Sequence, residues 1–181
     1  MRDFKRAHPA FSLCGLNCAL CAMHLGGYCP GCGGGAGNQS CAIARCGAEH
    51  GVAFCWDCGE YPCVRYEGFD EYDSFIPHRA RQRDVARAQA LGLEAYLAEL
   101  GERAKILRFL LEQYNDGRRK SFFSSAVYLL ELADVKDVVA RLPDADILPL
   151  KERAAEAAGL FQGMADAQGI ELKLNKKPKK R

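Results

Sequence analysis

The chain has 181 residues, of which 49% are hydrophobic and 27% are charged, and its formal net charge is +2. These values describe an ordinary soluble globule, either one compact domain or a small domain followed by a medium one. No stretch approaches the roughly 20 consecutive apolar residues of a membrane span. The sequence therefore excludes a membrane-spanning helix.

The charge is unevenly distributed along the chain. Residues 171–181 contain six basic residues and one acidic residue, Glu171, whereas the rest of the chain has 19 basic and 22 acidic residues. We therefore expect a mildly acidic folded body and a solvated basic tail at 171–181. Residues 1–9 are basic but lack the apolar run of a secretory signal, so we expect a cytoplasmic protein. In that reducing compartment, clustered cysteines favour metal thiolates over disulfides.

All ten cysteines fall in the first 63 residues, and this crowding is the main functional signal of the chain. Three pairs have the two-residue spacing that lets one tight turn direct two sulfurs at the same point, as a tetrahedral zinc site requires. The candidate metal ligands are Cys14, Cys18, Cys21, Cys29, Cys32, Cys41, Cys46, Cys55, Cys58 and Cys63.

Ten thiols allow two all-cysteine zinc sites with two cysteines left over. The spacing does not decide which cysteines share a site, because sequential and interleaved arrangements both fit it. His24 and His50 lie near the cysteines and could replace one as a ligand, although a histidine there is more often a surface or hydrogen-bonding residue. Arg45 could screen thiolate charge, although a solvated side chain is the simpler interpretation.

An iron–sulfur cluster is the alternative to zinc. The run Cys14-x3-Cys18-x2-Cys21 has the spacing that radical S-adenosylmethionine enzymes use to hold a [4Fe–4S] cluster. The chain lacks the alternating strands and helices of the barrel that such an enzyme needs. Thiolate sites accept zinc and iron alike, so the spacing alone leaves both cofactors open.

The sequence after the cysteine block predicts helices. A stripe of Leu93, Leu97, Leu100, Ala104, Leu107, Leu111 and Tyr114 follows a helical period, and Asn115-Asp116-Gly117 should end that helix. Further helices are expected at 79–90, from Ser121 to about Ala133, from a cap at Asp134 to Leu142, and at 149–168. The only alternation typical of a strand is at 170–174.

Together these patterns predict an α-rich fold with two lobes. A cysteine-knuckle lobe with little regular structure, at residues 10–66, should pack on a helical lobe at residues 78–170. The first lobe is too small and too rich in glycine, as at 33–40, to fold without bound metal.

The ordered motifs resemble a domain-of-unknown-function family of small prokaryotic cysteine-rich proteins. The likeness runs through Cys14-Gly15-Leu16-Asn17-Cys18-Ala19-Leu20-Cys21, Cys29-Pro30-Gly31-Cys32, Cys41-Ala42-Ile43-Ala44-Arg45-Cys46 and Cys55-Trp56-Asp57-Cys58-Gly59-Glu60-Tyr61-Pro62-Cys63. The resemblance implies zinc binding and adds no reaction. A cysteine pair found in the helical part of some relatives is absent here, so we expect no site there.

These observations favour a non-enzymatic zinc protein with closed structural sites and an interaction role. Tyr28, Trp56 and Tyr61 could form a contact surface for an unidentified protein partner, or they could pack beneath the metal loops. A redox or electron-transfer protein is the second hypothesis, and a nucleic-acid-binding zinc protein is the third. Residues 1–63 balance four basic against four acidic residues, so we do not expect nucleic acid as the partner.

No catalytic residues can be named from the sequence. The segment from Gly31 to Gly37 lacks the Lys-Ser/Thr of a phosphate-binding loop, and there is no Gly-x-Ser-x-Gly motif. His8, His24, His50 and His78 are scattered along the chain and form no recognisable Cys–His pair.

Overall fold

The computed structural model describes residues 4–35, 41–144 and 146–178. Part of the glycine-rich stretch, residues 36–40, and the last three basic residues, 179–181, lie outside the described residues. Within the described ranges the fold is helical, and the regular pairing of strands is limited to an isolated antiparallel bridge between Lys5 and Gly34. No helix there is long and apolar enough to cross a membrane.

The cysteine-rich region, residues 10–66, contains only short helices. These are the 3-10 helices η1 (Cys18–Leu20), η2 (Cys55–Asp57) and η3 (Val64–Tyr66) and the α-helices α1 (Ala22–Leu25) and α2 (Ala42–Glu49). The remaining helices are α3 (Arg81–Leu91), α4 (Leu93–Gln113), α5 (Lys120–Leu129), α6 (Leu132–Ala140) and α7 (Leu150–Ala167). The predicted class, a region of little regular structure packed on a helical region, is confirmed.

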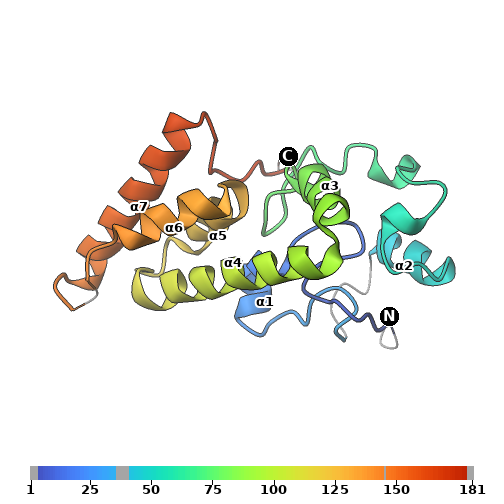
Figure 1. Cartoon of the computed structure of the whole chain (residues 1–181), viewed down its shortest axis with the longest axis horizontal. Helices are drawn as coiled ribbons and strands as arrows, with labels where there is room; N and C mark the ends of the chain where they lie inside the picture. Colours follow the sequence, from blue (N-terminus) through green and yellow to red (C-terminus); the bar gives the residue numbers. More distant parts are fainter. Residues whose placement is uncertain (1–3, 36–40, 145, 179–181) are drawn as a thin grey trace.

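The long helix α4 runs from the side of α5 and α6 to below α3, with α1 on its other side (Figure 1). It packs against α3, α5 and η1, so it contacts both regions. Residues after α7 return across the molecule towards α3, which brings the C-terminal segment beside the middle of the fold (Figure 1). The cysteine-rich region thus packs against the helical region through α4.

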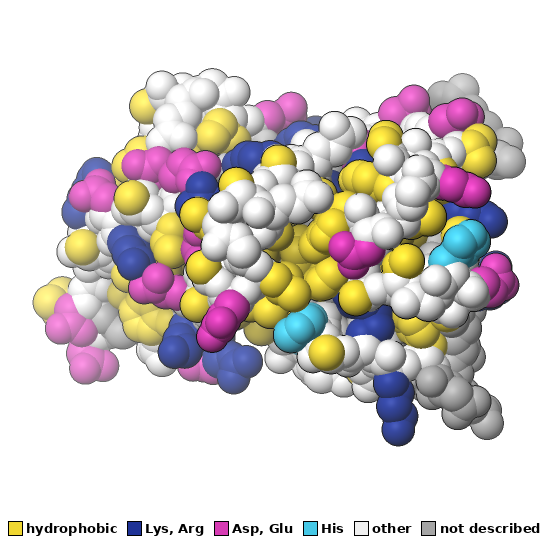
Figure 2. Space-filling view, turned by 45° about the vertical axis from the view of Figure 1, so that its right-hand side comes forward, with side chains coloured by type: hydrophobic (Ala, Val, Ile, Leu, Met, Phe, Trp, Pro, Cys, Tyr) yellow, Lys and Arg dark blue, Asp and Glu magenta, His cyan; other side chains and the backbone are white. Residues whose placement is uncertain are grey.

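One hydrophobic core joins the two regions. Phe11, Leu20 and Phe54 from the cysteine-rich region belong to the same buried cluster as residues of α4 and α5. A smaller cluster of Leu13, Cys14, Cys32, Ile43 and Ala44 lies apart from it, among the cysteine loops. Figure 2 shows hydrophobic side chains gathered near the middle of one face, with charged side chains mostly towards its edges.

The predicted helix from Ser121 to Ala133 is wrong at its end. Helix α5 stops at Leu129, and Leu130 has an extended backbone, so Ala133 and Asp134 belong to α6. The reason is tertiary. Arg103 donates to the carbonyl oxygens of Val127 and Leu130, both at 2.7 Å, and Arg83 donates to those of Tyr128 and Leu129, both at 3.0 Å. These arginines satisfy carbonyls that a continuing helix would have paired.

Candidate metal centres

Eight of the ten cysteines can be assigned to two neighbourhoods, one at a small buried cluster and one around a cavity. All ten cysteines are described, and none forms a disulfide. The first thiol group comprises Cys14, Cys18, Cys32 and Cys41, and the second thiol group comprises Cys46, Cys55, Cys58 and Cys63. As the side chains stand, no three Cys, His, Asp or Glu side chains in the described part of the chain converge closely enough to hold a metal ion.

The first thiol group is mostly buried. Cys14 and Cys32 are 8% and 5% exposed, and Cys18 and Cys41 pack against the same small cluster. Burial, with smaller contributions from the negative charges of Cys32 and Cys41, raises the pKa of Cys14 to about 12. Burial also raises the pKa of Cys18, with additional contributions from Cys14 and Cys32. The four thiols thus share one neighbourhood, the small cluster, which Cys55 also contacts.

Tight turns and local hydrogen bonds position this first group. Gly31 has φ +85°, and a Cβ there would lie 2.5 Å from the Pro9 carbonyl oxygen, so only glycine fits the turn before Cys32. The Ser12 hydroxyl lies 3.1 Å from the Cys14 sulfur. The backbone N–H of Ala44 donates to the Cys41 sulfur at 3.4 Å, which places that sulfur at the start of α2.

The second thiol group lines a small cavity of about 30 Å³. Burial raises the pKa of Cys55, and the negative charges of Cys63, Cys46 and Cys58 add to the increase. The cavity is large enough for about one small occupant, since a single water needs about 10–15 Å³. Its thiols come from α2, from η2 and the residue after it, and from the residue before η3.

Three non-cysteine side chains complete the surroundings of the second group. The Nδ1 of His50 lies 3.6 Å from the Cys46 sulfur and 2.9 Å from the Cys46 carbonyl oxygen. Arg65 lies against the same sulfur, and its hydrogen bond to Cys46 raises the pKa of the guanidinium. The buried hydroxyl of Tyr66, beside Cys55, has no well-formed hydrogen bond among the described residues.

Cys21 and Cys29 remain outside the two groups. Cys21 contributes to the raised pKa of Cys18. Cys29 is not among the groups that mainly raise the pKa of another cysteine. Its carbonyl oxygen lies 2.9 Å from His24 Nδ1. Cys55 and Cys58 thus line one cavity, whereas Cys29 is not among the residues that pack in the cluster of Cys32.

Hydrogen bonds connect the first group directly to the helical region. Asn17, between Cys14 and Cys18, donates through its side chain to Asp84 at 2.9 Å and to the Tyr96 hydroxyl at 2.8 Å. Its backbone N–H donates to the Tyr128 hydroxyl at 3.2 Å. One buried asparagine therefore contacts α3, α4 and α5.

Arg81 of α3 makes a second connection. Its guanidinium donates to the Cys14 carbonyl oxygen at 3.3 Å and to the Tyr61 hydroxyl at 3.0 Å, and it pairs with Asp70 at 2.7 Å. It also lies over the Tyr66 ring, 4.4 Å from the centroid. This side chain touches the surroundings of both thiol groups.

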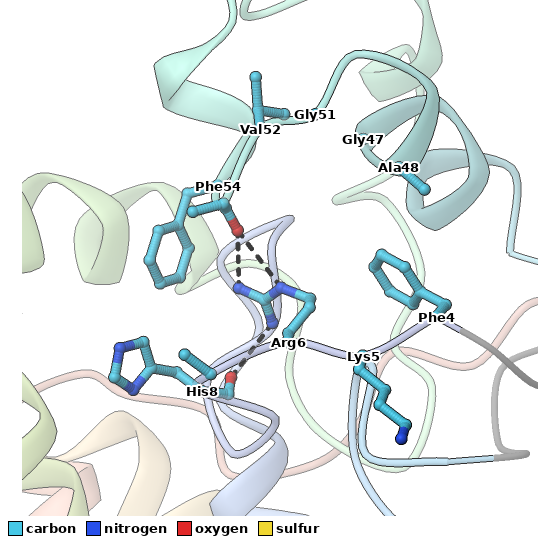
Figure 3. A pocket seen from close by; sticks show the side chains of 11 residues that line it. Phe4, Lys5, Arg6, His8, Gly47, Ala48, Gly51, Val52 and Phe54 are labelled. Atoms are coloured by element: carbon cyan, nitrogen blue, oxygen red, sulfur yellow. Dashed lines mark hydrogen bonds between the residues drawn. The ribbon is translucent and has the colours of Figure 1, made fainter.

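A hollow of about 690 Å³ lies between residues 4–8 and residues 47–54. Figure 3 shows the Arg6 side chain directed towards the segment between Val52 and Phe54, with Lys5 pointing away. Arg6 donates to the carbonyl oxygens of Ala53 at 2.8 Å and Phe11 at 2.9 Å. No acid, thiol or hydroxyl is among the lining residues, so the hollow brings together no catalytic set.

The three aromatics considered for a contact surface behave differently. Trp56 stacks on Phe54 with 4.1 Å between the ring centroids, and the Tyr61 hydroxyl is bonded to Arg81. Both are therefore part of the packing beneath the cysteine loops. Tyr28 is 78% exposed and remains available for contact.

Several residues around the thiols carried no signal in the sequence. Arg6 and Arg65 act on cysteines, whereas Arg45 is exposed, in agreement with the simpler interpretation of a solvated side chain. Three further residues contact partners that are distant along the chain: Asn17, Tyr66 and Arg81. Only the position of Asn17 between two candidate ligands could have drawn attention to it.

Comparison with known proteins gives a family match over part of the chain and no activity. Residues 25–68 match a family described as "Protein of unknown function (DUF3795)". The matched segment includes the whole second thiol group, together with Cys32 and Cys41. Over this segment the resemblance to an uncharacterised family is confirmed. No curated protein and no solved structure matches the chain.

Proposed function

We propose that the protein binds two zinc ions, one in each thiol group, in closed sites that fix the cysteine-rich region on the helical region. The observation that supports this proposal is the cavity lined by four cysteines of the second thiol group, together with the small buried cluster at which the first thiol group lies. Four thiolates complete the tetrahedron that zinc prefers, so neither site would keep an open coordination position for catalysis.

The donor sets fit zinc chemically, although the sulfurs have not converged. Thiolate charge in a buried site needs compensation, and each group has an arginine against one of its cysteines. Arg6 lowers the otherwise raised pKa of Cys32, and Arg65 lies against Cys46. The unsatisfied Tyr66 hydroxyl would donate to Cys55 once that sulfur is a thiolate. Zinc supplies folding free energy in such sites, and the thiols must release their protons to bind it.

A structural role is the consequence of closed sites. Asn17 and Arg81 couple the thiol loops to α3, so ordering these loops orders the surface where the two regions meet. We propose that this surface, including the exposed Tyr28, serves interaction with a partner protein in the cytoplasm.

The test is metal analysis of protein purified without oxygen, with a visible spectrum of the same sample. We expect two zinc ions per chain and no colour. Double substitution Cys14→Ser/Cys18→Ser should remove one ion, and Cys55→Ser/Cys58→Ser should remove the other. Cys21→Ser/Cys29→Ser is the matched control and should retain both ions.

Two results would contradict this assignment. Iron with matching sulfide and a broad visible band would instead indicate a cluster and a redox role. Loss of an ion from the Cys21→Ser/Cys29→Ser variant, with its circular dichroism at 222 nm unchanged, would show that the division of ligands is wrong.

A further inference from the structure

The cavity of the second thiol group has five potential metal donors around it. His50 lines it together with the four cysteines. Cys46 lies in α2 and His50 is the residue that caps it, four positions later, so the two side chains lie on the same face of the helix. The distance of 3.6 Å between His50 Nδ1 and Cys46 Sγ confirms that they are neighbours.

A four-coordinate ion needs only four of these five donors. Imidazole nitrogen and thiolate sulfur are both ordinary zinc ligands, and they combine readily in one tetrahedral site. His50 is exposed, so its ring can turn without disturbing a packed core. We propose that His50 is an alternate ligand of the second centre, able to take the coordination position of Cys46. This inference rests on the proposed zinc site.

Within the described contacts, the first thiol group has no equivalent. The Nδ1 of His24 lies 2.9 Å from the carbonyl oxygen of Cys29, which holds this ring. Cys41 is the thiol at the opposite end of α2 from Cys46, and its sulfur accepts a backbone N–H. Substitution of Cys41 therefore provides a matched comparison on the same helix.

The first experiment measures zinc content in purified variants of the full chain. Cys46→Ser should retain two zinc ions, whereas Cys46→Ser/His50→Ala should retain one. Cys41→Ser should retain one ion with or without His50. In the cobalt-substituted Cys46→Ser protein, the absorption from thiolate-to-cobalt charge transfer should decrease by the share of one thiolate, as expected for three sulfurs and one nitrogen.

Loss of the second ion from Cys46→Ser, or two ions in Cys46→Ser/His50→Ala, would overturn the proposal. A second measurement avoids any folding defect of the cysteine variants. In His50→Ala, zinc release from the second centre to a chromophoric chelator should be about tenfold faster, with the slow release of the first ion unchanged. An unchanged two-phase release would overturn the role of His50. Wild-type protein without zinc would instead contradict the proposed function itself.

Discussion

The side-chain amide of Asn17 donates to the carboxylate of Asp84 at 2.9 Å, across the boundary between the cysteine loops and α3. Asn17 is 3% exposed and has a candidate metal ligand directly after it in the chain, Cys18. The amide also donates to Tyr96. A structural change at the first thiol group is therefore transmitted to α3 and α4 of the helical region.

Substitution Asn17→Ala should lower the free energy of unfolding by about 3 kcal/mol, because it leaves buried groups of Asp84 and Tyr96 without their partner. Urea denaturation followed at 222 nm measures this loss. Gln162→Ala removes an exposed side chain bonded only to Asp166 and should stay within about 0.5 kcal/mol of wild type. Equal effects of the two substitutions would show that Asn17 does not join the two regions.

Asp84 should make stability depend on pH. Burial raises the pKa of its carboxyl from 3.8 to about 6, despite the opposing influence of Arg83. The folded protein thus binds this proton more tightly than the unfolded chain. The contribution of Asp84 is most favourable below pH 4 and is lost as the pH rises through about 6.

The measurement is the difference in unfolding free energy between wild type and Asp84→Asn, in which effects of pH on the thiols cancel. From pH 5 to pH 7.5 this difference should move against wild type by about 1 to 2 kcal/mol. Asp137→Asn is the control, since Asp137 lies on the surface and pairs only with the exposed Arg141. A difference that does not change with pH would contradict the raised pKa.

The helices could be predicted where a local pattern decides them. The apolar stripe from Leu93 to Tyr114 gave α4, and Asn115-Asp116-Gly117 marked its end. The break between α5 and α6 could not be predicted, because it depends on Arg83 and Arg103 reaching carbonyl oxygens from other helices.

The candidate site, too, could be predicted only where the local sequence pattern decides it. The cysteine spacing named the candidate thiols, and Cys55 and Cys58 line the same cavity. The division into two groups depends instead on how the loops fold around Leu13 and Ile43, which no spacing encodes. The arginines against the thiols are likewise placed by tertiary structure.

Arg6 should support both the N-terminal segment and the first centre. It donates to carbonyl oxygens of Ala53 and Phe11 and lies 4.9 Å from the centroid of the Phe54 ring. Arg6→Ala should lower the unfolding free energy by about 2 kcal/mol and weaken zinc binding at the first centre, because the pKa of Cys32 rises. The unfolding free energy and the zinc affinity of Arg6→Lys should lie between those of wild type and Arg6→Ala, since lysine keeps the charge but lacks the planar guanidinium.

Chelator competition and urea denaturation test this prediction. Lys5→Ala is the matched control, because Lys5 is exposed and points away from Arg6 (Figure 3). If both variants bind zinc as wild type does, the charge of Arg6 has no role at the first centre.

The C-terminal segment should act as a structural element, although its composition suggests a solvated tail. Leu172 is 4% exposed, and Asp73 and Asn175 exchange backbone and side-chain hydrogen bonds at 2.7 and 2.8 Å. Truncation after Ile170 should lower the unfolding free energy by about 2–3 kcal/mol from the loss of Leu172 burial alone. Truncation after Lys177 should leave stability unchanged, and thermal unfolding distinguishes the two. Equal midpoints would mean that residues 171–177 do not hold the fold.

Tyr66 offers a test of thiolate formation at the second centre. Its buried hydroxyl lies beside Cys55 without a well-formed hydrogen bond, and a buried unpaired hydroxyl is costly by about 1–3 kcal/mol. A metal-bound thiolate at Cys55 would accept a hydrogen bond from that hydroxyl, so Tyr66→Phe should weaken zinc binding at the second centre about tenfold. Tyr28→Phe removes the hydroxyl of an exposed side chain and should leave the zinc affinities of both centres unaltered. An unchanged affinity in Tyr66→Phe, with a higher unfolding free energy, would show that the hydroxyl has no partner even in the zinc-loaded protein.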